Sequence, residues 1–309
     1  MRRQRLGDTL FRAVTRSFAL GVLLLLGAII ASLVAGSIPA FHAFGLGFLF
    51  STAWNPVKDA FGALPAIYGT LITSLLAMML AVPLAFGIAI FLTELCPPLL
   101  RRPIGTLIEL LAAIPSIIYG IWGLFVLAPI LQSTLQPALI DSLGEIPYFG
   151  VLFAGPPLGL GILTASIILA VMVLPFIASV SRDVFLTVPP LLRESAYAMG
   201  ATTSEVIRDI IIPHSRIGIV GGVMLGLGRA LGETMAVTFV IGNAHHIKAS
   251  LLAPGTTISA TLANEFTEAV DQIYTSSLVA LGLILFVITL IVLALANYML
   301  WRMGSREGA

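Results

Sequence analysis

The chain has 309 residues, of which 58% are hydrophobic and only 10% are charged, and its mean hydropathy is +1.05. A soluble domain carries about 25% charged residues, so most of this chain must face lipid rather than water. Its net charge of +1 leaves no basic surplus for a nucleic-acid partner. The single cysteine, Cys96, excludes an intrachain disulfide. The composition therefore predicts an integral membrane protein.

Apolar stretches long enough to cross a bilayer as helices, which takes about 20 residues, occur six times. They cover residues 17–38, 66–95, 104–131, 159–180, 217–241 and 276–301. The first follows an Arg-rich start but is longer than the apolar core of a signal peptide, about 7–15 residues, so we expect it to be retained. The predicted fold is all-α with six transmembrane helices. Its parts are an N-terminal segment (1–16), a first helix with an outer loop (17–65), a main transmembrane domain (66–302) and a tail (303–309).

The distribution of cations predicts the orientation of these spans. Thirteen of the 16 Lys and Arg residues lie on the side that holds both termini. The opposite loops contain Lys58 and Lys248, and Arg229 lies within a span. Because cytoplasmic loops carry an excess of Lys and Arg, we expect both termini to be cytoplasmic.

The loop of residues 181–216 gathers charge in a chain that otherwise avoids it. Pro189 and Pro190 can begin a helix, Gly200 would end it, and Thr202 with Glu205 has capping-box spacing for a second short helix. The pattern predicts a helix–turn–helix that protrudes into the cytoplasm. A set of side chains on it would be available to a partner: Leu191, Leu192, Tyr197 and Met199. The alternative is a solvated connector.

The same loop contains Glu194-Ser195-Ala196, Gly200, Ile210, Ile212 and Pro213 at spacings that resemble the EAA loop of ABC-transporter permease subunits. Ser195 stands where that loop more usually has alanine. The resemblance implies that Glu194, Ala196, Gly200 and Pro213 belong to the element that couples to an ATP-binding subunit. A P-loop needs Gly-Lys-Ser/Thr, and neither lysine of the chain has this context. We therefore expect a non-catalytic permease, with ATP-Mg bound by a partner and no cofactor on this chain.

The fifth span contains a cation and an anion. On a continuous helix, Gly218, Gly222, Gly226, Arg229 and Glu233 would share one face, and the two charges could pair at a spacing of four residues. A charge at bilayer depth costs roughly 2.5–3.5 kcal/mol and usually faces a bundle interior or a pathway. A guanidinium suits an oxyanion, so we expect an anion pathway in which the carboxylate holds the guanidinium at rest. The alternative is an ion pair that only fixes helix packing.

The segment 222–243 resembles the PstC-type permease subunits of bacterial phosphate ABC importers, which belong to the type I ABC permease family. Residues 44–52, 61–70, 114–120 and 262–266 add to the resemblance. It implies inorganic phosphate as the substrate, the bacterial inner membrane as the location, and roles in transport for Arg229 and Glu233. It also implies three partners, namely a PstA-like permease in a heterodimer, a PstB-like ATP-binding dimer and a PstS-like phosphate-binding protein.

Other polar residues are weaker candidates. Ser116, Tyr119 and Thr234 could donate hydrogen bonds to a desolvated anion, although a helix hydroxyl often bonds its own backbone. His245 and His246 have no third ligand in the sequence pattern, so we expect no metal site. The sequence leaves open an ABC permease for sulfate or molybdate, an ion-coupled secondary transporter, and a membrane sensor or scaffold that transports nothing.

Overall fold

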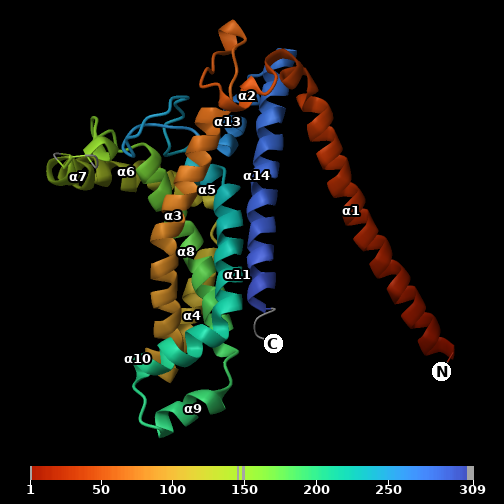
Figure 1. Ribbon diagram of the computed structural model, residues 1–309, viewed down its shortest axis with the longest axis vertical. Helices are drawn as coiled ribbons and strands as arrows, with labels where there is room; N and C mark the ends of the chain where they lie inside the picture. The colour runs from red at the N-terminus through yellow and green to blue at the C-terminus, as the bar shows by residue number, and fades with distance from the viewer. Residues whose placement is uncertain (1, 145, 148–149, 305–309) are drawn as a thin grey trace.

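The structure is a computed structural model that describes residues 2–144, 146–147 and 150–304. Within these residues, six helical segments are long and apolar enough to cross a membrane. They are Leu10–Phe44, Leu64–Leu95, Ser116–Leu143, Ile162–Leu186, Thr203–Leu231 and Gln272–Arg302. The start of α1 (Arg2–Phe44) and the last turn of α14 (Gln272–Gly304) both lie toward the end of the bundle that carries α9 (Pro190–Ala198), as Figure 1 shows. The predicted tail, 303–309, lies mostly outside the described residues.

The long helices pack around α8 (Ile162–Leu186), the most buried of the six spans. It contacts α3 (Leu64–Ile90), α4 (Pro98–Ala112) and α11 (Ile212–Leu231). On α11, a Cβ atom added to Gly218, Gly222 or Gly226 would approach a side chain of α8 to within 3.0 Å. The predicted glycine face is therefore a close helix–helix contact, as small residues provide in membranes.

The third span differs from the prediction of residues 104–131. Helix α4 ends at Ala112, and α5 (Ser116–Trp122) begins after Pro115, which has an extended backbone. The membrane span is Ser116–Leu143, which continues through α6 (Ala128–Ile130) and α7 (Gln136–Leu143). Because proline disfavours a helical conformation in the residue before it, the break at Pro115 separates an amphipathic helix from the true span.

The fifth span also ends earlier than predicted. Helix α11 stops at Leu231, and after α12 (Met235–Thr238) the chain continues without a helix to α13 (Ile258–Glu265). Backbone groups of this stretch bond to the start of α8. Gly161 N donates to Val240 O at 3.0 Å, and Leu163 N donates to Leu251 O at 2.8 Å. These bonds satisfy a non-helical backbone that lies against protein rather than lipid.

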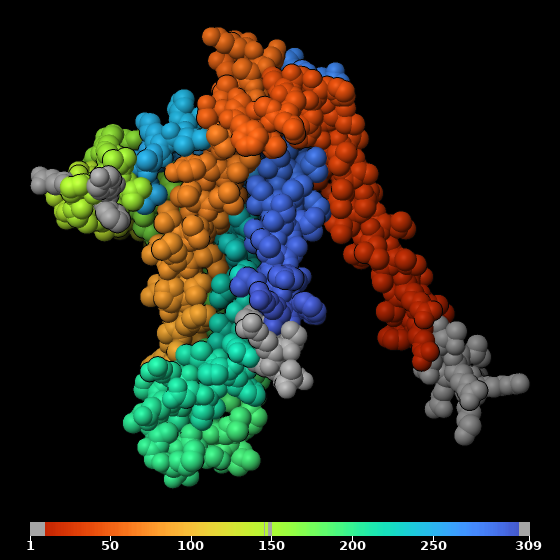
Figure 2. Space-filling view, viewed as in Figure 1, coloured from red at the N-terminus to blue at the C-terminus, as the bar shows by residue number. Residues whose placement is uncertain are grey.

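The first helix, α1 (Arg2–Phe44), stands apart from the body of the molecule over much of its length (Figures 1 and 2). Near its C-terminal end it is fixed to α14 (Gln272–Gly304), where Ser276 Oγ donates to Gly36 O at 2.8 Å and accepts from Ala40 N at 2.9 Å. A short helix, α2 (Gly47–Phe50), follows.

A carboxylate ties together the end of the molecule opposite α9. Glu265, at the end of α13, accepts hydrogen bonds from Trp54 Nε1 and Tyr274 Oη, each at 2.8 Å, and lies 2.7 Å from His245 Nε2. The Trp54 and His245 rings stack with centroids 5.0 Å apart. One side chain thus joins the loop between α2 and α3, the non-helical stretch and α14. None of this was predicted, since Trp54 lies 211 positions from Glu265 and no local pattern joins the cluster.

We expect Glu265→Gln to destabilise this end by about 1–3 kcal/mol, the cost of leaving donors without an acceptor. Burial alone would raise the pKa of Glu265, but hydrogen bonds from His245, Tyr274 and Trp54 outweigh it and the pKa is lowered. The carboxylate therefore stabilises the fold above its unfolded pKa of about 4.3, and this contribution is lost as pH falls through the folded value. Thermal unfolding of the purified protein in detergent between pH 3 and 7 measures both effects.

The matched control is Asp59→Asn, which changes an exposed carboxylate in the loop that also carries Trp54. It should leave the midpoint and its pH dependence unchanged. Equal behaviour of the two variants would show that the Glu265 cluster does not stabilise the fold.

Candidate functional site

The broken end of α11 holds the two charged residues of the fifth span. Arg229 lies in the last turn, and Gly232 caps the helix. The Arg229 side chain is exposed and makes no hydrogen bond or ion pair with the described residues. Glu233 is half-buried beyond the break, and its Oε1 accepts a hydrogen bond from Ala236 N at 3.3 Å.

The expected pairing of Arg229 with Glu233 is therefore absent from the described ion pairs. The physical reason is the position of the helix end. Residues four apart face each other only while the helix continues, and here the chain leaves the helix at Gly232. Glu233 instead binds a backbone N–H of the α12 turn, and the guanidinium of Arg229 is free to bind another anion.

Helix α5 lies against this break. A Cβ atom at Gly120 would lie 2.9 Å from Met235 O and 3.2 Å from Ala236 Cα, so α5 and α12 approach backbone to backbone. Tyr119 is buried, and the charge of Arg229 acts on its hydroxyl. The structure thus brings Arg229, Glu233, Thr234 and Tyr119 into one region around α5 and α12.

The hydroxyls of this region are engaged to different degrees. Tyr119 Oη donates to Leu111 O at 2.9 Å, which ties α5 to the end of α4. Thr234 Oγ1 makes a long contact of 3.4 Å with Gly232 O. Ser116 is half-buried at the first position of α5, and no side-chain bond of it occurs among the described residues. Thr234 and Ser116 are the hydroxyls with the most remaining capacity to bind a solute.

The loop of residues 181–216 forms the helix–turn–helix that the sequence predicts. Helix α9 begins after Pro189, Gly200 adopts φ +88° at the turn, and α10 (Thr203–Val206) begins with the complete Thr202–Glu205 capping box. The positive φ suits glycine, which lacks the Cβ that restricts other residues. At the tip, Leu191 is 71% and Met199 83% exposed.

The four residues of the EAA resemblance are not equivalent in this loop. Glu194 is exposed on α9, and Pro213 is exposed in the first turn of α11. Ala196 is 4% exposed and packs in a cluster with Ala89, Phe185 and Val206. Glu194 is therefore available to a partner, whereas Ala196 holds the loop against the ends of α3 and α8.

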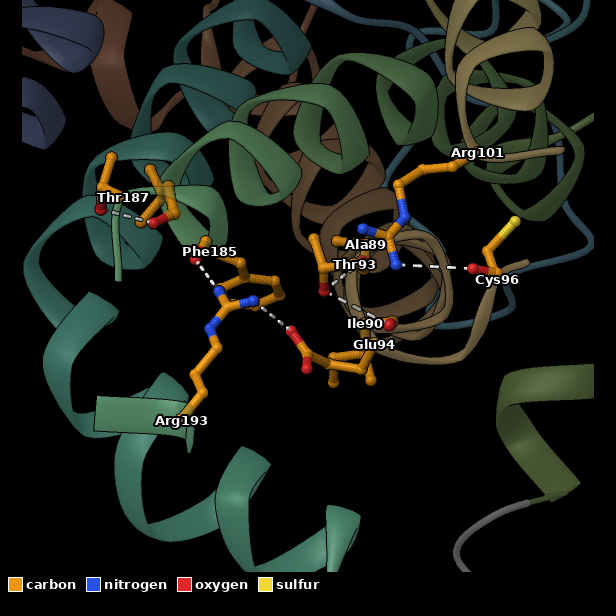
Figure 3. A network of polar contacts seen from close by, with 10 residues as sticks. Ala89, Ile90, Thr93, Glu94, Cys96, Arg101, Phe185, Thr187 and Arg193 are labelled. Carbon is orange, nitrogen blue, oxygen red and sulfur yellow. Dashed lines mark hydrogen bonds and ion pairs between the residues drawn. The ribbon is translucent and has the colours of Figure 1, made fainter. Parts of the chain in front are cut away.

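An ion pair that the sequence analysis missed joins the loop to the membrane helices (Figure 3). Arg193 Nη1 of α9 lies 3.0 Å from Glu94 Oε1, in the π-helical turn Phe91–Leu95 that ends the second span. The Glu94 side chain is 7% exposed. The contact does not meet hydrogen-bond geometry, so it is ionic, and Arg193 also donates to Phe185 O of α8. An acidic residue in an apolar run was the available signal, because such a charge needs a partner.

Helices of this chain resemble those of known transporters in sequence and in fold. The family described as binding-protein-dependent transport system inner membrane component matches residues 81–304. The chain is 65% identical to the phosphate transport system permease protein PstC of Mesorhizobium japonicum, over 100% of this chain and 94% of that protein. It is 56% identical to PstC of Pasteurella multocida, over 97% and 94% of the two chains.

Two solved structures have the same fold at low sequence identity. One is a bacterial alginate ABC transporter in complex with a pentasaccharide-bound periplasmic protein, with a TM-score of 0.58, 19% identity, and coverage of 94% of this chain and 97% of that one. The other is the inward-facing MetNI methionine ABC transporter, with a TM-score of 0.57, 15% identity, and coverage of 77% and 94%. The predicted type I ABC importer permease fold is confirmed. The chain belongs to the family of binding-protein-dependent transport system inner membrane components, as a multi-pass inner membrane permease of the PstC type.

Proposed function

We propose that this chain forms part of the membrane pathway of an ATP-driven importer of inorganic phosphate. The observation that carries the proposal is the exposed guanidinium of Arg229 at the broken end of α11, without a carboxylate partner among the described residues. A guanidinium offers paired N–H donors that match the oxygens of phosphate. The names of its relatives, phosphate transport system permease proteins over nearly the whole chain, support the same substrate.

The partners follow from the fold and from the loop of residues 181–216, the proposed coupling loop. Helix α9 presents Glu194 and exposed apolar side chains at one end of the bundle, as a docking element for an ATP-binding subunit requires. ATP-Mg would bind there, on a PstB-like dimer, and this chain would carry out no hydrolysis. A PstA-like permease would complete the pathway, and a PstS-like protein would deliver phosphate on the opposite side. With α9 in the cytoplasm, both termini are cytoplasmic too.

Glu233 and the hydroxyls have secondary roles in this proposal. Glu233 fixes the turn that follows α11 through its bond to Ala236 N, and its negative charge near Arg229 limits how tightly an anion is held. Ser116 and Thr234 would donate hydrogen bonds to phosphate once it has lost water, while Tyr119 holds α5 in position through Leu111 O.

We expect Arg229→Ala to reduce ATP-dependent phosphate uptake by about ten- to a hundredfold, because it removes charge-assisted hydrogen bonds of about 1.5–3 kcal/mol each. The measurement is uptake of radiolabelled phosphate by vesicles that contain the assembled complex, with and without ATP on the cytoplasmic side. Arg229→Lys, which keeps the positive charge but lacks the paired N–H donors of the guanidinium, should retain part of the activity.

Lys58→Ala, which removes an exposed cation from the first outer loop, is the matched control and should transport normally. If Arg229→Ala complexes that assemble normally transported at the wild-type rate, the residue would have only a packing role. Uptake that ignored ATP would indicate an ion-coupled carrier, and equal inhibition by sulfate would indicate a wider oxyanion substrate.

We expect Arg193→Met to uncouple the loop from the membrane helices. It leaves the buried Glu94 carboxylate unpaired, a change that costs about 3 kcal/mol when a buried ion pair loses one partner. The number of phosphate ions imported per ATP hydrolysed should fall several-fold, measured as uptake and hydrolysis in the same vesicles. Adding Glu94→Gln should restore part of the ratio, because no unpaired charge then remains.

Arg208→Met provides a control on the same loop, since the Arg208 side chain is 87% exposed and lies 3.9 Å from Asp209. It should keep the wild-type ratio. A ratio for Arg193→Met equal to that of Arg208→Met would mean that the Arg193–Glu94 pair takes no part in coupling.

A further inference from the structure

A cavity of about 310 Å³ opens near the end of the bundle that carries α9, and neither Arg229 nor Glu233 is among the residues that line it. Its walls come from the π-helical turn Phe91–Leu95, from α4 and from the last turns of α8. The polar residues that line it are Thr93, Arg101, Arg102, Thr106, Glu109 and Arg182. Three guanidinium groups therefore meet in one small space beside the coupling loop.

The three arginines differ in how they are satisfied. Arg182 is held by carboxylates, with Nη2 at 2.9 Å from Glu109 Oε1 and 3.0 Å from Asp183 Oδ1. Arg101 is half-buried, and among the described residues its side chain makes one hydrogen bond, a long one of 3.4 Å from Nη2 to Cys96 O (Figure 3). The Nε atom of Arg101 is buried and has no hydrogen-bond partner among the described residues.

The cavity consequently keeps an excess of positive charge. Glu109 and Asp183 are both engaged with Arg182. Neither Arg101 nor Arg102 has a carboxylate within ion-pair distance among the described residues. A buried N–H donor without an acceptor costs about 1–3 kcal/mol, and an anion that accepts from Arg101 removes that cost.

Gly105 of α4 leaves room for the guanidinium of Arg182 at the wall of the cavity. A Cβ atom there would lie 2.5 Å from Arg182 Nη1, so glycine allows the guanidinium of α8 to cross the backbone of α4. The cavity wall thus depends on a residue without a side chain, and adding one methyl group would displace Arg182.

We propose that this cavity is a binding site for a phosphate group, carried either by the headgroup of an anionic phospholipid or by free inorganic phosphate. Arginine guanidinium groups bind phosphate oxygens with paired N–H donors, and basic pockets between membrane helices are typical sites for anionic headgroups. Leu92 and Leu186 complete the wall, and the exposed Leu99 and Leu107 of α4 offer an apolar surface for acyl chains beside it.

The cavity lies between elements that also contact α9, so a ligand bound in it would affect how α9 is joined to the membrane helices. The turn that carries Thr93 also carries Glu94, and α8 provides the Phe185 carbonyl, so both walls are elements that Arg193 joins to α9. A phosphate group between α4 and these elements would hold them together at the coupling loop. The inference rests on the proposed function only for which side of the membrane this end faces.

The test uses the full complex, purified in detergent and stripped of lipid, in an Arg229→Ala background that removes the proposed pathway site. Native mass spectrometry measures retention of added phosphatidylglycerol against phosphatidylcholine, and equilibrium dialysis measures binding of radiolabelled orthophosphate. The Arg101→Gln/Arg102→Gln double variant removes the unpartnered donors. Arg12→Gln/Arg16→Gln, which removes two exposed cations from α1, is the matched control.

We expect Arg101→Gln/Arg102→Gln, the cavity variant, to lower phosphatidylglycerol retention or orthophosphate affinity by at least about tenfold. This is the effect of losing one charge-assisted hydrogen bond. The control variant should be unchanged. A loss confined to phosphatidylglycerol identifies a lipid headgroup, and a loss of orthophosphate binding identifies free phosphate. Gly105→Ala, which keeps every charge, should also weaken binding, and Arg101→Lys should restore part of it. These two variants test the site if the double variant fails to assemble.

Two results would overturn the proposal. In the first, Arg101→Gln/Arg102→Gln and the control Arg12→Gln/Arg16→Gln retain both ligands equally well. In the second, both double variants lose binding to the same extent, which would show adventitious binding that depends only on net charge. Neither result depends on whether the complex transports phosphate. A failed transport assay with a positive binding result would therefore reject the proposed substrate and keep this site.

Discussion

Within a membrane, backbone N–H and C=O groups must find partners inside the protein, and the end of α11 is where this requirement shapes the molecule most. The chain leaves its helix at Gly232 and does not regain a regular span before α14. Its free backbone groups bond to the start of α8, as from Leu163 N to Leu251 O at 2.8 Å. Because α8 supplies these bonds, a break in the fifth span is stable there, and Arg229 is left exposed beside it.

The same requirement explains which parts of the fold the sequence could predict. The existence of six spans depends on local apolar content and was predicted correctly. The turn between α9 and α10 depends on local chemistry, at Gly200 and in the Thr202–Glu205 capping box, and it was also predicted. The end of α11 depends on bonds between the stretch that follows it and a segment about 80 residues earlier in the chain, such as Gly161 N to Val240 O. No local pattern in the sequence contains that information.

The third span is a different case, because the sequence does contain a local signal for the break, Pro115. The apolar content of the run around it favoured one continuous span instead. Residues 104–131 read as one apolar run, yet Pro115 divides them, and residues before a proline avoid the helical conformation. The N-terminal part of that run belongs to α4, whose Arg101 and Arg102 line the basic cavity. Apolar content alone could not distinguish an amphipathic helix from the start of a span, and the cavity was therefore not foreseen.

The pairing of Arg229 with Glu233 shows how a site prediction depends on a helix boundary. The two residues were chosen for their charge in an apolar segment, a criterion that does not depend on the geometry. Their pairing, in contrast, assumed a continuous helix, and the break at Gly232 removes it. Glu94 and Arg193 illustrate the converse, since their 3.0 Å contact joins residues about 100 positions apart. Charge indicated that Glu94 needs a partner, but only the fold identifies that partner.

These contacts form a continuous physical connection between the two functional regions. Arg193 joins α9 to the end of α3 and, through Phe185 O, to α8. Helix α8 packs against the glycines of α11 so closely that Cβ atoms at Gly218 and Gly226 would clash with its side chains. Such a contact transmits displacement rather than absorbing it, because a packed interface has little free volume. Contacts from Arg193 through α8 thus connect α9 with α11, the helix whose last turn holds Arg229.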